Sequence, residues 1–408
     1  MQNSFTVNTM QQRFRFMTRV LLLYLLLCVW HAHAKPAALR DHPSLLQKKD
    51  LPPKVIVGYA SECNDQVLTA VQQGVNVVIW AFYHLRPDNS LSSASSSRTS
   101  SLERQLPTRI DLDCIQDIMD QLNQQGFSDT VHLVSLGGWN GPHLDPYFHT
   151  ASQWYEAWKA LVGNIFHGID IDFEGNDDMQ SPWNYMSLEE LDRVGDIMTL
   201  AKGDGYLITM APAQSYLDIH TSHFSRYLNL TDSSRTWHGD FAYFGRNLYA
   251  YWLAKYGSSI DLVMIQYYES YSRAAMEITQ NNMTPENYLQ QYVWDLNQPQ
   301  DGPGWKVDFG ADLPGQAGIQ HVPFPLSKLV WGFANAWANT NNGGRTLYFP
   351  PNTVQAAYQN LWDWMLEPRG MMFWNIAKEG EQGIYYAREL NDILHIRNFG
   401  KTDLTTSA

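Results

Sequence analysis

Short apolar runs alternate with amphipathic stretches along most of this chain. The run at 54–59 (KVIVGY) predicts a buried strand, and Val67, Leu68 and Val71 then recur with the period of a helix. A later stretch from Ile115 to Leu122 repeats apolar residues at i, i+3, i+4 and i+7, which predicts another helix. Strands are predicted near residues 54–59, 75–82, 131–136, 169–173, 207–211, 260–267, 329–333 and 370–373.

Eight strands separated by helices indicate an α/β protein. Parallel strands need crossover connections, and nearly continuous apolar runs imply that both faces of the sheet are covered. We therefore predict a closed (β/α)₈ TIM barrel that forms a single domain, with a doubly wound parallel sheet as the alternative. Two segments interrupt the alternation, a serine-rich loop at 90–101 and a Gly/Pro-rich insertion at 298–325. We expect both near the C-terminal face of the barrel, although the serine run is also typical of a linker.

The N-terminal residues have the pattern of a secretory signal peptide. Arg13, Arg15 and Arg19 precede an apolar run at 20–30, and the small-residue motif Ala-His-Ala follows at 32–34. A membrane span needs about 20 residues, so we expect secretion and no stable membrane insertion, with an uncleaved signal anchor as the alternative. The expected organisation is a signal peptide at 1–34, a linker at 35–52, the barrel at 53–396 and a tail at 397–408.

Composition and charge exclude some classes of protein. The chain has 28 Lys+Arg and 41 Asp+Glu, a net charge of −13, which argues against nucleic-acid binding because phosphate recognition needs clustered positive charge. Hydrophobic residues make up 44% and aromatic residues 13%, enough for a packed core.

The cysteines and sequons fit a secreted chain. Cys28 would leave with the signal peptide, and the remaining pair, Cys63 and Cys114, is predicted to form one disulfide rather than two free thiols. Sequons at Asn229 and Asn282 predict a glycoprotein, although a three-residue pattern is weak evidence.

A row of acidic residues carries the chemistry. In a strand at 167–174 (HGIDIDFE), Asp170, Asp172 and Glu174 would share one face, because side chains alternate along a strand. Neighbours in that row lie about 6.6 Å apart, at roughly 3.3 Å rise per residue, so their titrations are coupled. Burying like charges is costly, so the row predicts an acid site or a cation site rather than packing; a solvated edge strand is the alternative.

The row resembles the Asp-x-x-Asp-x-Asp-x-Glu signature of glycoside hydrolase family 18, the chitinases and their relatives. Four further segments resemble family motifs in the same order, each on a predicted strand: SLGG at 135–138, MAP at 210–212, QYYE at 266–269 and GMMFW at 370–374. The resemblance covers roughly residues 53–396 and implies a catalytic domain there.

The resemblance implies hydrolysis of β-1,4 bonds between N-acetylglucosamine units with retention of configuration. The substrate's own acetamido oxygen would attack C1, so no enzyme nucleophile is needed. Glu174 would be the general acid and then the base, while Asp172 would orient the acetamido group and stabilise the oxazolinium intermediate. Asp170 would share a proton with Asp172, and Tyr268 would hydrogen-bond the acetamido oxygen.

The resemblance also implies a set of substrate contacts. Trp374 would form the floor beneath the reacting sugar, and Tyr59, Phe82, Met210 and Gln266 would line the same subsite. The expected partner is chitin or an oligosaccharide that contains N-acetylglucosamine, bound by a monomer without a cofactor or metal ion.

Two positions depart from the family pattern. His167 replaces the first Asp of the signature; it would either pair with Asp170 when charged at acidic pH or serve as a spacer. Glu269 stands where the family usually has Asn or Asp, and it would add negative charge near the acetamido pocket.

Three other functions are compatible with parts of this pattern. A chitinase-like lectin on the same barrel would bind without cleaving, although such proteins usually lose the glutamate that Glu174 represents. An endo-β-N-acetylglucosaminidase would apply the same chemistry to N-glycans. A metal site built on the acidic row is disfavoured, because no His-x-x-x-His pair, nearby Cys cluster or calcium-loop spacing accompanies it.

Overall fold

The computed structural model describes residues 48–85, 111–144, 148–178, 180–228, 236–238, 241–242, 245–269, 272–298, 304–313, 315, 317–339 and 346–395. The predicted signal peptide at 1–34, most of the linker at 35–52, the serine-rich loop at 90–101, the sequon residue Asn229 and the tail at 397–408 lie outside these residues.

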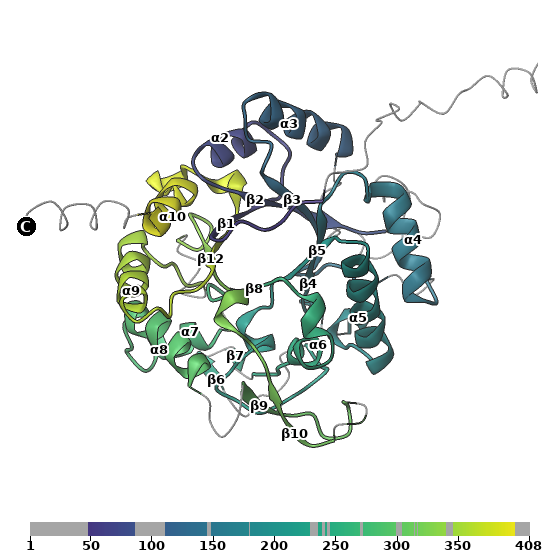
Figure 1. Cartoon of the computed structure of the whole chain (residues 1–408). Coiled ribbons are helices and arrows are strands. Elements are labelled where there is room, and N and C mark those ends of the chain that lie inside the picture. The colour runs from purple at the N-terminus through teal and green to yellow at the C-terminus, as the bar shows by residue number, and fades with distance from the viewer. Residues whose placement is uncertain are drawn as a thin grey trace, which may run out of the picture. The chain divides into compact units, whose positions relative to one another are not determined.

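Eight parallel strands close into a barrel surrounded by helices (Figure 1), which confirms the predicted (β/α)₈ fold. Closure through the pairing of the first strand with the last excludes the doubly wound sheet. Every predicted strand is present, with bounds that differ by at most two residues. In chain order they are β1 Val55–Ala60, β2 Val77–Tyr83, β3 Val131–Gly138, β4 Gly168–Phe173, β5 Leu207–Met210, β8 Leu262–Gln266, β11 Leu329–Ala334 and β12 Gly370–Trp374.

The helices that cover the barrel begin at residues suited to capping. Thr150 and Gln153 form a reciprocal capping box at the start of α4, and Asp111 accepts from the Cys114 amide at the start of α3. The helices are α2 Gln66–Gln72, α3 Leu112–Gln124, α4 Ala151–Val162, α5 Leu188–Gly203, α6 Ala250–Tyr256, α7 Arg273–Thr279, α8 Pro285–Asn297, α9 Pro351–Asp363 and α10 Tyr386–His395.

Alternation along the strands produces two separate apolar layers. In β1, Val55, Val57 and Tyr59 pack inside the barrel, whereas Ile56 and Ala60 pack in the layer between strands and helices. Side chains alternate in the same way along β4, where the even-numbered residues point into the barrel. This alternation decides which side chains of β4 can meet inside the barrel.

The predicted insertion at 298–325 contains an antiparallel pair, β9 Trp305–Asp308 and β10 Ile319–Val322. It lies beside the segment that follows β5, because Asp308 forms a bridge with His223 and Phe309 contacts Phe224 with ring centroids 5.0 Å apart. A second short pair consists of β6 Thr236–His238 and β7 Phe241–Ala242.

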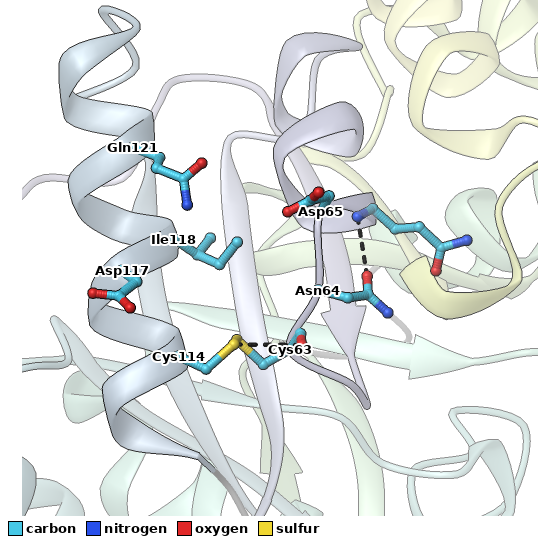
Figure 2. A pocket seen from close by; sticks show the side chains of 8 residues that line it. Cys63, Asn64, Asp65, Cys114, Asp117, Ile118 and Gln121 are labelled. Atoms are coloured by element: carbon cyan, nitrogen blue, oxygen red, sulfur yellow. Dashed lines mark hydrogen bonds between the residues drawn. A yellow bond between two sulfur atoms is a disulfide. The ribbon is translucent and has the colours of Figure 1, made fainter.

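The predicted disulfide between Cys63 and Cys114 is present, with Cα atoms 6.2 Å apart. It joins the segment after β1 to α3 at the edge of an open hollow of about 580 Å³ lined by polar side chains such as Asp117 and Gln121 (Figure 2). Among the described residues, no helix combines the length and apolarity that a membrane crossing requires.

Candidate active site

Asp170 and Asp172 project from β4 into the barrel, and Glu174 directly follows that strand. Strand pairing places Asp170 beside Ser135 of β3 and Thr209 of β5, both of which face the same interior. Asp170, Asp172 and Glu174 are all buried, with 0%, 3% and 5% of their surface exposed. The predicted sharing of one face is therefore confirmed, and a solvated edge strand is excluded.

Asp170 sits at the bottom of the row and accepts three hydroxyl hydrogen bonds. Tyr59 and Ser135 donate to Oδ2, each at 2.7 Å, and Thr209 donates to Oδ1 at 2.6 Å. Burial raises the pKa of Asp170, while these three bonds act against that rise by favouring the charged form. Asp170 thus has an environment built for a carboxylate, in spite of its complete burial.

Asp172 and Glu174 form a coupled pair above it. Burial raises the pKa of Asp172 well above its ordinary value, and the negative charges of Glu174, Asp170 and Glu269 add to the effect. Gln266 donates to Asp172 Oδ1 at 2.9 Å, and this hydrogen bond partly offsets the rise in the pKa of Asp172.

Burial also raises the pKa of Glu174 well above its ordinary value, with Glu269 as the next cause. Within the described part of the chain, Glu174 Oε2 is buried and lacks a hydrogen-bond partner. Burial and mutual repulsion therefore favour the protonated form of the pair, and one carboxyl oxygen of Glu174 has no hydrogen-bond partner among the described residues.

Side chains from three separate segments fix the main chain around Glu174. The Glu174 carbonyl accepts from His143 Nε2 at 2.9 Å, and the preceding carbonyl of Phe173 accepts from the Tyr249 hydroxyl at 3.0 Å. The following amide, that of Gly175, donates to the Tyr216 hydroxyl at 3.1 Å. His143, Tyr216 and Tyr249 could not be predicted from the sequence, because they come from loops without a motif.

Aromatic side chains stand next to the acidic row. Trp374 lies with its ring centroid 5.8 Å from that of Tyr59, whose hydroxyl bonds Asp170, and 5.8 Å from Phe82, on which it stacks at 22°. Tyr268 faces the interior and contacts Trp337 edge-on at 5.8 Å. Burial and then Glu269 raise the pKa of Tyr268 well above its ordinary value, so its hydroxyl stays protonated and can donate.

The glycine pair at the end of β3 makes room for this arrangement. A Cβ at Gly137, where φ is +105°, would lie 2.4 Å from the carbonyl oxygen of Asp172. At Gly138 a Cβ would lie 2.5 Å from the ring of Phe82. Any side chain here would displace the main chain of the acidic row or the aromatic group beside it.

The structure corrects the prediction that Met210 lines the subsite. Strand parity turns Thr209 and Ala211 toward the interior and Met210 into the layer beneath the helices, where it is fully buried. The motif identified the strand correctly, but its methionine points away from the acidic row.

The hypothesis that a charged His167 pairs with Asp170 is also wrong. His167 Nδ1 accepts the main-chain N–H of His132 at 2.9 Å, and burial lowers the pKa of His167 to about 3. His167 precedes β4 and has an odd number, whereas the even-numbered residues of this strand point into the barrel. Its side chain therefore points away from Asp170, and His167 serves as a spacer at the start of the strand.

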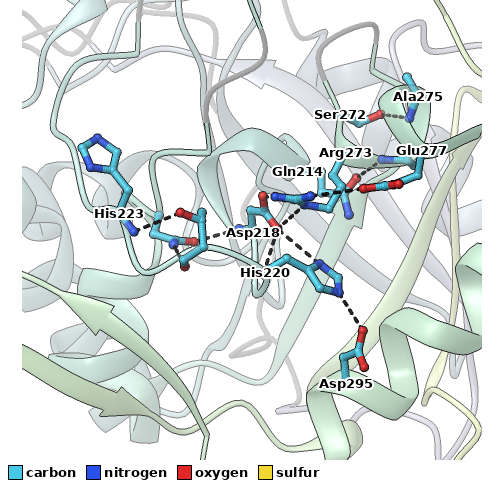
Figure 3. A network of polar contacts seen from close by, with 12 residues as sticks. Gln214, Asp218, His220, His223, Ser272, Arg273, Ala275, Glu277 and Asp295 are labelled. Atoms are coloured by element: carbon cyan, nitrogen blue, oxygen red, sulfur yellow. Dashed lines mark hydrogen bonds and ion pairs between the residues drawn. The ribbon is translucent and has the colours of Figure 1, made fainter. Parts of the chain in front are cut away.

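An ionic network joins the segment after β5 to helices α7 and α8 (Figure 3). Asp218, from the segment after β5, bonds Arg273 Nε at 3.0 Å and lies 3.4 Å from His220 Nδ1. His220 Nε2 bonds Asp295 of α8 at 2.8 Å, and hydrogen bonds to both acids raise the pKa of His220 to about 9 in spite of burial. The network holds the start of α7, four residues after Glu269.

The described residues contain no group of three or more His, Cys, Asp or Glu side chains placed to hold a metal ion. What the row can do chemically is hold, donate and accept a proton beside an aromatic surface.

Comparison with known proteins assigns the family. The model of glycosyl hydrolases family 18 matches residues 55–406, and the chain belongs to this family. A family 18 chitinase from Chromobacterium violaceum has a similar fold, at 14% identity and a TM-score of 0.50 over 87% of both chains. A family 18 chitinase from Pseudoalteromonas aurantia matches at 16% identity and a TM-score of 0.48, over 84% of this chain and 99% of that one. A fungal endo-β-N-acetylglucosaminidase of family 18 matches at 15% identity and a TM-score of 0.47, over 84% of this chain and 98% of that one. No curated protein matches the chain significantly.

Proposed function

We propose that this chain is a chitinase-type glycoside hydrolase that cleaves β-1,4-linked N-acetylglucosamine polymers with retention, through an oxazolinium intermediate. The observation that carries this proposal is the burial of Asp172 beside Glu174, which raises the pKa of both carboxyl groups well above their ordinary values and leaves one oxygen of Glu174 unbonded among the described residues. A carboxyl group that stays protonated near neutral pH can act as a general acid.

In the first step Glu174 transfers its proton to the glycosidic oxygen as the bond from that oxygen to C1 breaks. The acetamido oxygen of the sugar forms a new bond to C1, and the positive charge spreads over the oxazolinium ring. Asp172 accepts the acetamido N–H and stabilises this charge, while Tyr268 donates to the acetamido oxygen. In the second step Glu174 takes a proton from water, which attacks C1 and opens the ring.

Asp170 completes the row as the carboxylate held by three hydroxyl groups. Its charge favours retention of the shared proton by Asp172 and Glu174 before the sugar binds. Trp374 would lie beneath the reacting sugar, flanked by Tyr59 and Phe82, and Gln266 would hold Asp172 in place. These contacts suit an uncharged ligand with apolar C–H faces.

We further propose that the protein is secreted as a monomer after removal of residues 1–34, with a linker at 35–52, the catalytic domain at 53–396 and a tail at 397–408. The disulfide supports this location, because disulfides persist in oxidising compartments.

The experiment compares the native protein with Glu174→Gln on N-acetylglucosamine hexasaccharide. Glu189→Gln, an exposed glutamate on α5, is the matched control. We expect loss of at least about a hundredfold in kcat for Glu174→Gln, the scale of general acid catalysis, and no change for the control. Binding of the hexasaccharide by the native protein without cleavage would identify a lectin. Cleavage of a high-mannose glycopeptide in preference to the hexasaccharide would identify an endo-β-N-acetylglucosaminidase.

A further inference from the structure

One asparagine holds the peptide that carries Trp374 at two points. The main-chain N–H of Asn335, directly after β11, donates to the Trp374 carbonyl at 3.0 Å. Its side-chain Nδ2 donates to the next carbonyl, that of Asn375, at 2.9 Å. Asn335 is fully buried, so water cannot replace these bonds when they are lost.

Asn335 is in turn held by Glu379. Nδ2 of Asn335 donates to Glu379 Oε1 at 2.7 Å, which orients the amide toward both of its acceptors. The Glu379 carboxyl group also accepts main-chain N–H groups from Tyr386 at 3.2 Å and Ala387 at 2.9 Å, at the start of α10. A carboxylate is favoured at a helix N-terminus, so Glu379 links the first turn of α10 to the Trp374 segment.

We propose that Asn335 and Glu379 are positioning residues that set the affinity for sugar by fixing the Trp374 platform. This inference rests on the proposed function, because Trp374 is the floor of the subsite there. The hydrogen bonds of Asn335 and Glu379 described here join them to each other, to the Trp374 segment and to the start of α10, and not to the acidic row. Both residues would therefore act through Trp374.

The clamp formed by Asn335 and Glu379 depends on pH. All three groups bonded to the Glu379 carboxyl are donors, so the ionised form satisfies them best and protonation removes one acceptor. Burial raises the pKa of Glu379 to about 7, and Glu389 of α10 adds to the rise. Of the other titratable neighbours, Tyr386 has a pKa raised by burial and stays neutral, and Lys378 bonds Glu381 at 2.8 Å. Sugar should therefore bind more tightly above pH 7 than below it.

The test measures the dissociation constant of N-acetylglucosamine tetrasaccharide by calorimetry at pH 5.5 and pH 8, with Glu174→Gln present in the native reference and in every variant so that the sugar is not cleaved. We expect Glu379→Gln to bind as the native protein does at pH 5.5 and about fivefold more weakly at pH 8, the equivalent of one hydrogen bond. Asn335→Ala should weaken binding about tenfold at pH 8, raising KM with kcat within about twofold. Asn339→Ala is the matched control: its amide bonds Gln382 at 2.9 Å across the same two segments, but at the surface.

Equal dissociation constants for native protein and Glu379→Gln at both pH values would overturn the proposal. So would an effect of Asn335→Ala no larger than that of Asn339→Ala. Thermal unfolding identifies any misfolded variant, and Glu379→Gln, which keeps size and shape, decides the matter if Asn335→Ala does not fold. If the native protein does not bind the tetrasaccharide at all, the proposed function fails too. If it binds, but the ratio of the Glu379→Gln dissociation constant to the native one is the same at pH 5.5 and pH 8, only this inference fails.

Discussion

Replacing Thr209 by valine removes one of the three hydroxyl groups that donate to the buried Asp170 carboxylate, with little change in shape. The bond is 2.6 Å long, which is typical of a hydroxyl bonded to a charged oxygen. Such a bond contributes about 1.5–3 kcal/mol, compared with about 1 kcal/mol for a neutral one. We expect Thr209→Val to cost about 2 kcal/mol of unfolding free energy at pH 8.

The loss of unfolding free energy in Thr209→Val should be larger at high pH than at low pH. The folded-state pKa of Asp170 is already raised, so its contribution to stability is fully present below the unfolded pKa and is lost as pH rises through the folded pKa. Removing a donor raises that pKa further. The variant should therefore lose about 2 kcal/mol at pH 8 and about half of that at pH 4, because the raised pKa favours the protonated form of Asp170 at the lower pH.

Urea unfolding at the two pH values measures this difference. Thr199→Val is the matched control, because the Thr199 hydroxyl donates at 2.9 Å to the neutral carbonyl of Gly195 within α5. The control should show the same loss at both pH values. An equal loss for Thr209→Val at pH 4 and pH 8 would refute the idea that Asp170 ionises in the folded row.

Three further changes test other parts of the site and fold. Glu269→Gln removes a charge that raises the pKa of Glu174, so the alkaline limb of the kcat/KM profile should move to lower pH; an unmoved limb would contradict this. Gly137→Ala places a methyl 2.4 Å from the Asp172 carbonyl at φ +105° and should cost at least about 1–3 kcal/mol in urea unfolding, together with activity. Removing the disulfide by two Cys→Ser changes opens a connection between positions 51 residues apart and should cost about 4 kcal/mol; a loss below about 1 kcal/mol would count against the chain-entropy explanation.

The strands could be predicted from sequence because each is a short apolar run covered on both sides. The acidic row could be predicted because three carboxylates at alternate positions have no reason to be buried other than chemistry. Met210 shows where this reasoning fails: a motif locates a strand, but a shift of one residue reverses the side chain's direction. Ala211, one residue further along, faces the interior instead.

The residues that support the site could not be predicted in the same way. His143, Tyr216 and Tyr249 reach the Glu174 main chain from three different loops, and each looks in sequence like an ordinary polar or aromatic residue. Asn335 and Glu379 are 44 residues apart and meet only because β11 and β12 are neighbours. Such contacts depend on tertiary packing rather than on local pattern.

The anomeric form of the first product tests the central claim most directly. N-acetylglucosamine hexasaccharide is mixed with the native protein, and proton NMR follows the new reducing end before mutarotation. We predict that the β-anomer appears first, because attack by the acetamido oxygen and then by water gives two inversions at C1. Initial α-anomer would mean a single attack by water and would contradict the substrate-assisted mechanism.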